Sequence, residues 1–171
     1  MNFEEESENI VPIEMDLNII FEDNYLLIIN KPAGIPVHPS IAHYKNSLSN
    51  GVKYYFNMIG LNKKIRPVNR LDKDTSGIVI FAKHEYIQEH LIKQMKTSIF
   101  KKEYQAILTG HLTNKNGKIA APIARKDGSI IEREINFETG EKAITYYRVL
   151  NEFYINDTPL SLVNFLLETG R

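Results

Sequence analysis

The chain has 171 residues, of which 43% are apolar and 25% are charged, so it is long enough to bury the core of a globular domain. It contains no cysteine, which excludes disulfides, thiolate metal sites and cysteine nucleophiles and fits a reducing cytoplasm. Its first residues are acidic and no apolar run is long enough to cross a bilayer. We therefore expect a cytoplasmic protein with neither a signal peptide nor a membrane anchor.

The formal net charge of zero hides an asymmetry along the chain. Residues 1–30 hold eight acids and no Lys or Arg, so residues 31–171 carry 21 bases against 13 acids, a net charge of +8. Residues 61–102 alone hold ten bases and four acids. This distribution favours a polyanionic partner, and a solvated basic face is the alternative interpretation.

We expect residues 1–15 to form an acidic, disordered tail. Residues 16–171 are expected to form one domain. Alternating apolar residues predict a hairpin over 18–30 that turns at Asp23-Asn24. Three prolines and a glycine make residues 31–39 a stiff loop.

Residues 47–60 have apolar side chains at helical spacing, with Ser47 able to cap the helix and Gly60 able to end it. A basic loop follows, and the apolar run 78–82 predicts a buried strand. The spacing of apolar residues in 84–98 predicts a second helix.

The C-terminal half is rich in strand signals. Strands are predicted over 101–110, 143–154 and 160–168. Turn signals that divide the remainder into short strands are Asn116-Gly117, Lys126-Asp127-Gly128 and Thr139-Gly140. Two helices among many strands, often at hairpin spacing, predict an α+β fold with a mixed, mostly antiparallel sheet and flanking helices.

The most informative stretch is RPVNRLDKDTSGIVIFAK, residues 66–83, which places Asp72 between Arg70 and Lys73 just ahead of the apolar strand. A charged turn mounted on a buried strand is typical of a functional site. Taken alone, such an Asp more often forms a surface ion pair. The stretch also has the look of an aspartyl-phosphate loop, D-x-D-x-T, but Thr75 comes one residue too early, so phosphoryl transfer is disfavoured.

The segment NRLDKDTSG, residues 69–77, resembles the H/N-R-L-D-x-x-T-S-G signature of the RluA/RluD family of pseudouridine synthases. Four further segments resemble this family in the same order along the chain, which makes the resemblance much more specific than one short motif. These segments are FEDNYLLIINKPAGIPVHPS at 21–40, KKEYQAILTGH at 101–111, GEKAITYYRVL at 140–150 and LLETGR at 166–171.

The resemblance implies an enzyme that isomerises uridine in RNA to pseudouridine without cofactor or metal. Asp72 would be the nucleophile, which must be ionised to attack, and flanking cations favour that form. Arg70 would fill the space left by the extruded base, and Tyr104 would pack against the target uracil. Leu71, Thr75, Ser76 and Gly77 would support the loop. Asn69 stands where many members of the family have His.

The expected RNA is ribosomal, with large-subunit RNA as first choice, or transfer RNA, and a monomer is favoured. The five histidines show no metal-ligand spacing, so no metal is expected. Candidate contacts to RNA phosphates are Lys63, Lys64, Arg66, Lys93, Lys96, Lys101 and Lys102.

The chain stops at Arg171, where the resembled motif continues with x-H-Q-I-R and supplies an Arg that pairs with the catalytic Asp. We therefore expect a C-terminally incomplete catalytic domain that is inactive, or nearly so, as it stands. The alternative is a non-catalytic, RNA-binding remnant of such a domain. A steep fall of affinity with salt would distinguish both from a protein that does not bind RNA.

Overall fold

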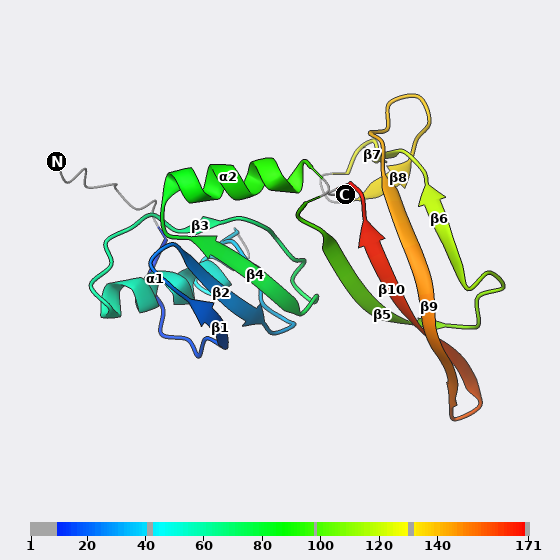
Figure 1. Ribbon diagram of the computed structural model, residues 1–171, viewed down its shortest axis with the longest axis horizontal. Coiled ribbons are helices and arrows are strands. Elements are labelled where there is room, and N and C mark those ends of the chain that lie inside the picture. Colours follow the sequence, from blue (N-terminus) through cyan, green and yellow to red (C-terminus); the bar gives the residue numbers. More distant parts are fainter. Residues whose placement is uncertain (1–9, 41–42, 98, 130–131, 170–171) are drawn as a thin grey trace. The chain divides into compact units, whose positions relative to one another are not determined.

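The computed structural model describes residues 10–40, 43–97, 99–129 and 132–169 (Figure 1). The chain divides into two compact units, Met1–Lys96 and Thr97–Arg171. Both units contain antiparallel sheets and the first also contains two helices, which confirms the α+β prediction. No helix in the described part of the chain is both long and apolar enough to span a membrane.

The first unit is built on a four-stranded antiparallel sheet in the order β1-β2-β4-β3. The predicted hairpin is confirmed, and its turn is fixed by the Asp23 carboxylate, which accepts the N–H groups of Tyr25 and Leu26 at 2.7 Å each. The strands are β1 (Ile19–Glu22), β2 (Leu26–Lys31), β3 (Arg66–Pro67) and β4 (Gly77–Ala82).

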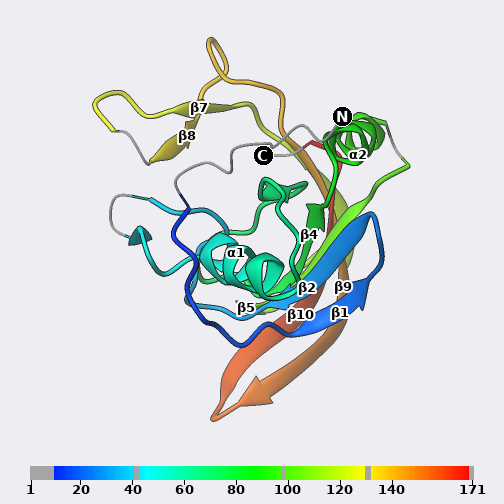
Figure 2. The ribbon, with the colours of Figure 1, turned by 90° about the vertical axis from the view of Figure 1, so that its left-hand side faces the viewer.

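Helix α1 (Leu48–Met58) packs over this sheet (Figure 2). Ser47 is its N-cap, as predicted, and the Asn50 side chain accepts hydrogen bonds from the Ser47 N–H at 3.0 Å and from its hydroxyl at 2.5 Å. The core of the unit lies between helix and strands, because both contribute fully buried apolar side chains. These are Leu27, Ile29, Val79 and Phe81 from the strands and Leu48, Val52 and Phe56 from α1.

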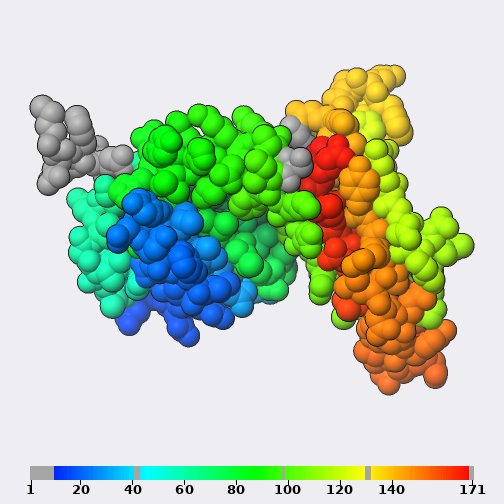
Figure 3. Space-filling model, viewed as in Figure 1, coloured from blue at the N-terminus to red at the C-terminus, as the bar shows by residue number. Residues whose placement is uncertain are grey.

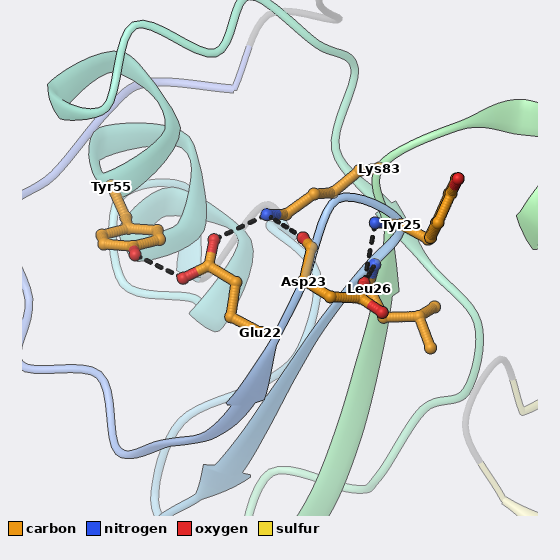
Figure 4. Close-up of polar contacts among 6 residues, drawn as sticks. All are labelled: Glu22, Asp23, Tyr25, Leu26, Tyr55 and Lys83. Atoms are coloured by element: carbon orange, nitrogen blue, oxygen red, sulfur yellow. Dashed lines mark hydrogen bonds and ion pairs between the residues drawn. The ribbon is translucent and has the colours of Figure 1, made fainter.

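A polar cluster of Glu22, Tyr55 and Lys83 ties β1 to α1 and to the residue that follows β4 (Figure 4). The ammonium of Lys83 lies 2.7 Å from Glu22 Oε1 and also donates to the Asp23 carbonyl at 2.6 Å. The Tyr55 hydroxyl donates to the other Glu22 oxygen at 2.5 Å. Burial alone would raise the pKa of Glu22, but the hydrogen bonds from Lys83 and Tyr55 and the charge of Lys83 lower it.

Helix α2 (Glu85–Met95) lies on the surface of the first unit (Figure 3). Its predicted apolar face is only partly covered, since none of its residues is fully buried.

The prediction of a disordered tail over residues 1–15 needs a correction at its C-terminal end. Residues 1–9 lie outside the described residues, but Val11 and Ile13 hydrogen-bond to Asn50 of α1, at 2.8 and 3.2 Å. Met15 packs so closely on Gly51 that a Cβ added to Gly51 would lie 3.0 Å from it. The apolar residues between the acids give this segment a surface to bury, which the count of acids did not reveal.

The second unit is a four-stranded antiparallel sheet in the order β5-β10-β9-β6, with a separate β7-β8 hairpin. Strands β9 and β10 are joined by a two-residue turn in which Asn156 and Asp157 have φ of 48° and 62°, as suits a tight hairpin. The strands are β5 (Lys102–Thr109), β6 (Asn116–Ala120), β7 (Ile123–Arg125), β8 (Arg133–Ile135), β9 (Ile144–Ile155) and β10 (Thr158–Leu167).

The predicted turn at Asn116-Gly117 is wrong, because both residues belong to β6 and pair with Arg148 and Tyr147 of β9. The glycine has a packing role instead: a Cβ at position 117 would lie 2.7 Å from the Tyr147 ring. The other two turn signals are confirmed, since residues 127–128 form a turn between β7 and β8 and residues 137–139 form a turn after β8.

Candidate active site

The loop from Val68 to Ser76 connects β3 to β4 and carries Arg70 and Asp72, both of which are exposed. The carbonyl of Asp72 accepts the N–H of Thr75 at 3.1 Å, so the residues after the carboxylate form a turn. The loop therefore presents the Asp72 carboxylate to solvent on a short, folded segment that is anchored in the sheet at both ends.

Leu71 points the other way and packs against the core of the first unit. At the end of the loop, Gly77 has φ of 132°, a backbone conformation that side chains rarely allow. A Cβ placed there would approach the Leu71 side chain at 3.7 Å, which is ordinary van der Waals contact, so the glycine is needed for its backbone rather than for space. Leu71 therefore supports the loop through its packing, and Gly77 supports it through its backbone conformation.

Lys31 is a site residue that the sequence did not single out. Its side chain is fully buried, and its ammonium donates to the carbonyls of Pro32, Ile35 and Lys73 at 2.9, 2.8 and 2.9 Å. The Lys73 carbonyl also accepts the Gly34 N–H at 2.9 Å. The loop after Asp72 is thereby fastened to the proline-rich loop that follows β2.

Burial lowers the pKa of Lys31, and the negative charges of Asp74 and Asp72 partly oppose this change. A signal in the sequence could have identified the residue: a lysine that ends an apolar strand and precedes a proline has its stem inside the protein, where its charge requires oxygen partners.

Asn69 fixes the start of the loop. Its side-chain oxygen accepts the N–H of Ile80 and its side-chain nitrogen donates to the carbonyl of Ile78, each at 2.9 Å.

Tyr104 belongs to the second unit, whereas Arg70 and Asp72 belong to the first. It lies on β5, an edge strand of the sheet, where it pairs with Phe165 of β10. Its side chain is half-buried. Arg171, at the end of the last resembled motif, lies outside the described residues.

The predicted phosphate contacts differ in exposure. Lys101 is exposed, and Lys63, Lys64 and Lys102 are half-buried. Arg66 is only 6% exposed and donates to the Lys64 carbonyl at 3.3 Å, so it is a poorer candidate for RNA backbone than its charge indicated. Lys64 and Arg66 line an open pocket of about 320 Å³ together with His38, Ile65, Pro67, Glu85 and Gln88.

The signature at residues 69–77 lies on this loop, with an exposed carboxylate, and comparisons with known proteins show the family to which the chain belongs. Residues 25–171 match the family model described as RNA pseudouridylate synthase, so the chain belongs to this family.

Curated relatives support the same assignment. The chain is 39% identical over 168 residues to the uncharacterized RNA pseudouridine synthase YhcT of Bacillus subtilis, with 98% of this chain and 55% of the relative covered. It is also 39% identical over 166 residues to the ribosomal large subunit pseudouridine synthase D of Blochmanniella floridana, covering 96% and 50%. The chain thus spans about half the length of these relatives.

Solved structures with the same fold include a human protein named RNA pseudouridylate synthase domain containing 1. The TM-score is 0.70 at 22% identity, and the match covers 91% of this chain and 61% of the human one. At this identity the likeness shows the fold alone.

Proposed function

We propose that this chain carries the nucleophile of an RNA pseudouridine synthase and that the nucleophile is Asp72. The observation that carries the proposal is the Asp72 carboxylate itself: it is exposed, it stands in the family signature, and its loop is fastened by Lys31, Gly34 and Asn69. A preorganised, exposed carboxylate can attack a nucleoside that has been turned out of its RNA stack.

In the proposed reaction the Asp72 carboxylate bonds to the ribose carbon as the bond from that carbon to N1 of uracil breaks. The uracil then turns, and its C5 bonds to the ribose carbon as the bond to Asp72 breaks and frees the carboxylate. The proton at C5 is then lost and N1 takes one up, so the product is an isomer of the substrate. No cofactor or metal is needed for this balance.

Arg70 and Tyr104 complete the proposal. Arg70 is exposed two residues before Asp72 and can occupy the stack that the target base leaves. Tyr104 offers an aromatic ring for the uracil, and such stacking is worth about 1–3 kcal/mol per base. Exposed basic side chains such as that of Lys101 can contact RNA phosphates, and such contacts do not depend on the RNA sequence.

Large-subunit ribosomal RNA is the proposed substrate, with transfer RNA second. The support is the name that several relatives share, ribosomal large subunit pseudouridine synthase D. The proposed setting is the cytoplasm, where these RNAs are found.

The test is made in a polypeptide extended to the length of the curated relatives, since this chain spans about half of that length. It compares the wild-type sequence with Asp72→Asn and Asp74→Asn, which remove the same charge from the same loop. Each is incubated with large-subunit ribosomal RNA or transfer RNA, and pseudouridine is located by carbodiimide mapping. In the extended polypeptide we expect product from the wild type and from Asp74→Asn. Asp72→Asn should lose at least about 1000-fold in rate, which corresponds to about 4 kcal/mol of barrier.

RNA binding should survive in Asp72→Asn, because the nucleophile contributes little to contacts with the backbone. Full turnover by Asp72→Asn would remove Asp72 from the mechanism. Salt-sensitive RNA binding by the extended wild-type polypeptide without formation of pseudouridine would favour the non-catalytic RNA-binding alternative.

A further inference from the structure

Asn69 lies where the main chain leaves the sheet of the first unit for the Asp72 loop. Strands β3 and β4 pair in the register Arg66↔Ala82 and Pro67↔Phe81, and the Val68 N–H still donates to the Ile80 carbonyl at 2.7 Å. If the antiparallel ladder continued, the backbone N–H and C=O of residue 68 would both hydrogen-bond to Ile80. Those of residue 70 would both hydrogen-bond to Ile78.

The carboxamide of Asn69 occupies two of these places. Its oxygen accepts the Ile80 N–H, which a continued ladder would give to the carbonyl of residue 68. Its nitrogen donates to the Ile78 carbonyl, which a continued ladder would pair with the N–H of residue 70. One side chain therefore satisfies a donor and an acceptor of β4 while the main chain turns away from the strand.

We propose that Asn69 is a positioning residue for Asp72, because its carboxamide replaces the last step of the β3-β4 ladder and so fixes how the Arg70–Asp72 segment leaves the sheet. The consequence for catalysis rests on the proposed function. Asp72 is only three residues beyond this anchor, and a misplacement of about 1 Å at a reacting group can cost about 100-fold in rate.

The first test uses Asn69→Asp. At neutral pH the carboxylate keeps the acceptor for the Ile80 N–H but loses the donor for the Ile78 carbonyl, and protonation restores that donor. In NMR spectra we therefore expect the Ile80 amide resonance of Asn69→Asp to return toward its wild-type position as the pH falls. The midpoint should lie above about 3.9, the usual value for Asp, because the carboxylate faces a carbonyl oxygen.

The matched control is Asn62→Asp, the same change at an exposed position of the preceding loop. It should leave the Ile80 resonance in place at every pH. An Ile80 amide that does not respond to pH in a folded Asn69→Asp would overturn the proposal, because a residue that merely fills space has no donor to regain.

The second test uses Asn69→Ala with Asn62→Ala as control. We expect the backbone of residues 70–74 to become mobile in Asn69→Ala, seen as lowered heteronuclear NOE values, while the control keeps wild-type values. Where the chain turns over RNA, kcat should fall about 100-fold in Asn69→Ala with KM for RNA unchanged.

The two proposals can fail separately. A wild-type polypeptide extended to the length of its relatives that shows no turnover contradicts the proposed function, whereas the NOE values of the chain still report on positioning. Wild-type NOE values in residues 70–74 of a folded Asn69→Ala would overturn the role of Asn69 even in a fully active enzyme.

Discussion

Lys31 shows how one buried cation can shape a site without touching a substrate. Its three hydrogen bonds all go to main-chain carbonyls, two in its own loop and one at Lys73, the residue after the proposed nucleophile. Because these contacts are to the backbone, they fix the path of the Asp72 loop and not the identity of its exposed side chains.

Replacing Lys31 with Met tests this arrangement. The variant keeps most of the buried stem but removes the Lys31 donor from three carbonyls. The Lys73 carbonyl keeps the Gly34 N–H, whereas the carbonyls of Pro32 and Ile35 lose the ammonium, and a buried unsatisfied group costs about 1–3 kcal/mol. Since water can reach some of them after the change, we expect the free energy of unfolding to fall by about 3 kcal/mol in denaturant titrations followed by circular dichroism.

Lys73→Met is the control, because Lys73 is exposed and should change stability by less than about 0.5 kcal/mol. Equal losses in the two variants would show that the ammonium of Lys31 does not hold the loop.

At the scale of elements, the Glu22-Tyr55-Lys83 cluster joins a strand, a helix and the residue after a second strand. The carboxylate of Glu22 is its centre, since both other side chains donate to it. The exposed fraction is 24% for the Glu22 side chain and 8% for that of Lys83, so water screens this ion pair less than a surface pair.

The lowered pKa of Glu22 makes this cluster sensitive to acid. Between the pKa of Glu22 in the folded protein and its ordinary pKa of 4.5, the unfolded chain binds more protons than the folded one. The contribution of Glu22 to stability is therefore complete above pH 4.5 and is lost as the pH falls through the pKa of the folded protein. We expect Glu22→Gln to be less stable than the wild type at pH 7 and the difference to shrink by pH 3.

Denaturant titrations at several pH values measure this difference. Glu89→Gln, at an exposed position of α2, is the control and should follow the wild type throughout. A difference between Glu22→Gln and the wild type that stays constant from pH 7 to pH 3 would contradict the lowered pKa.

For the molecule as a whole, periodicity and turn residues predicted most elements because their signals are local. The hairpin at 18–30, the helix capped by Ser47 and the long strands of the second unit all follow from such signals. Contacts between distant residues could not be read in this way. Gly117 pairs with Tyr147 in a strand and leaves room for the Tyr147 ring, and a glycine next to Asn looks like a turn when that ring is unknown.

The same distinction holds for the site. The motif predicted Asp72 and Arg70 as candidates, and the structure places them together on one loop. Lys31 and Asn69 act through backbone atoms 42 and 11 residues away, and the motif did not single them out for these contacts.

The uneven charge of the chain leads to a prediction about RNA capture. Residues 1–9 carry four acids, Glu4, Glu5, Glu6 and Glu8, ahead of residues 10–171, whose 21 bases and 17 acids give a net charge of +4. Changing all four to Gln raises the formal charge of the chain from 0 to +4. Long-range electrostatic attraction governs the rate at which a protein associates with a polyanion, so the variant should associate with RNA several-fold faster at low salt. Stopped-flow fluorescence measures this rate.

This gain should disappear as salt rises, since the screening length falls from about 30 Å at 0.01 M to about 3 Å at 1 M. Changing the same four residues to Asp keeps every charge and should leave the association rate as in the wild type. If the Gln and Asp variants associate equally fast at low salt, the four acids do not oppose RNA binding, and the formal charge of the chain does not govern how fast it meets RNA.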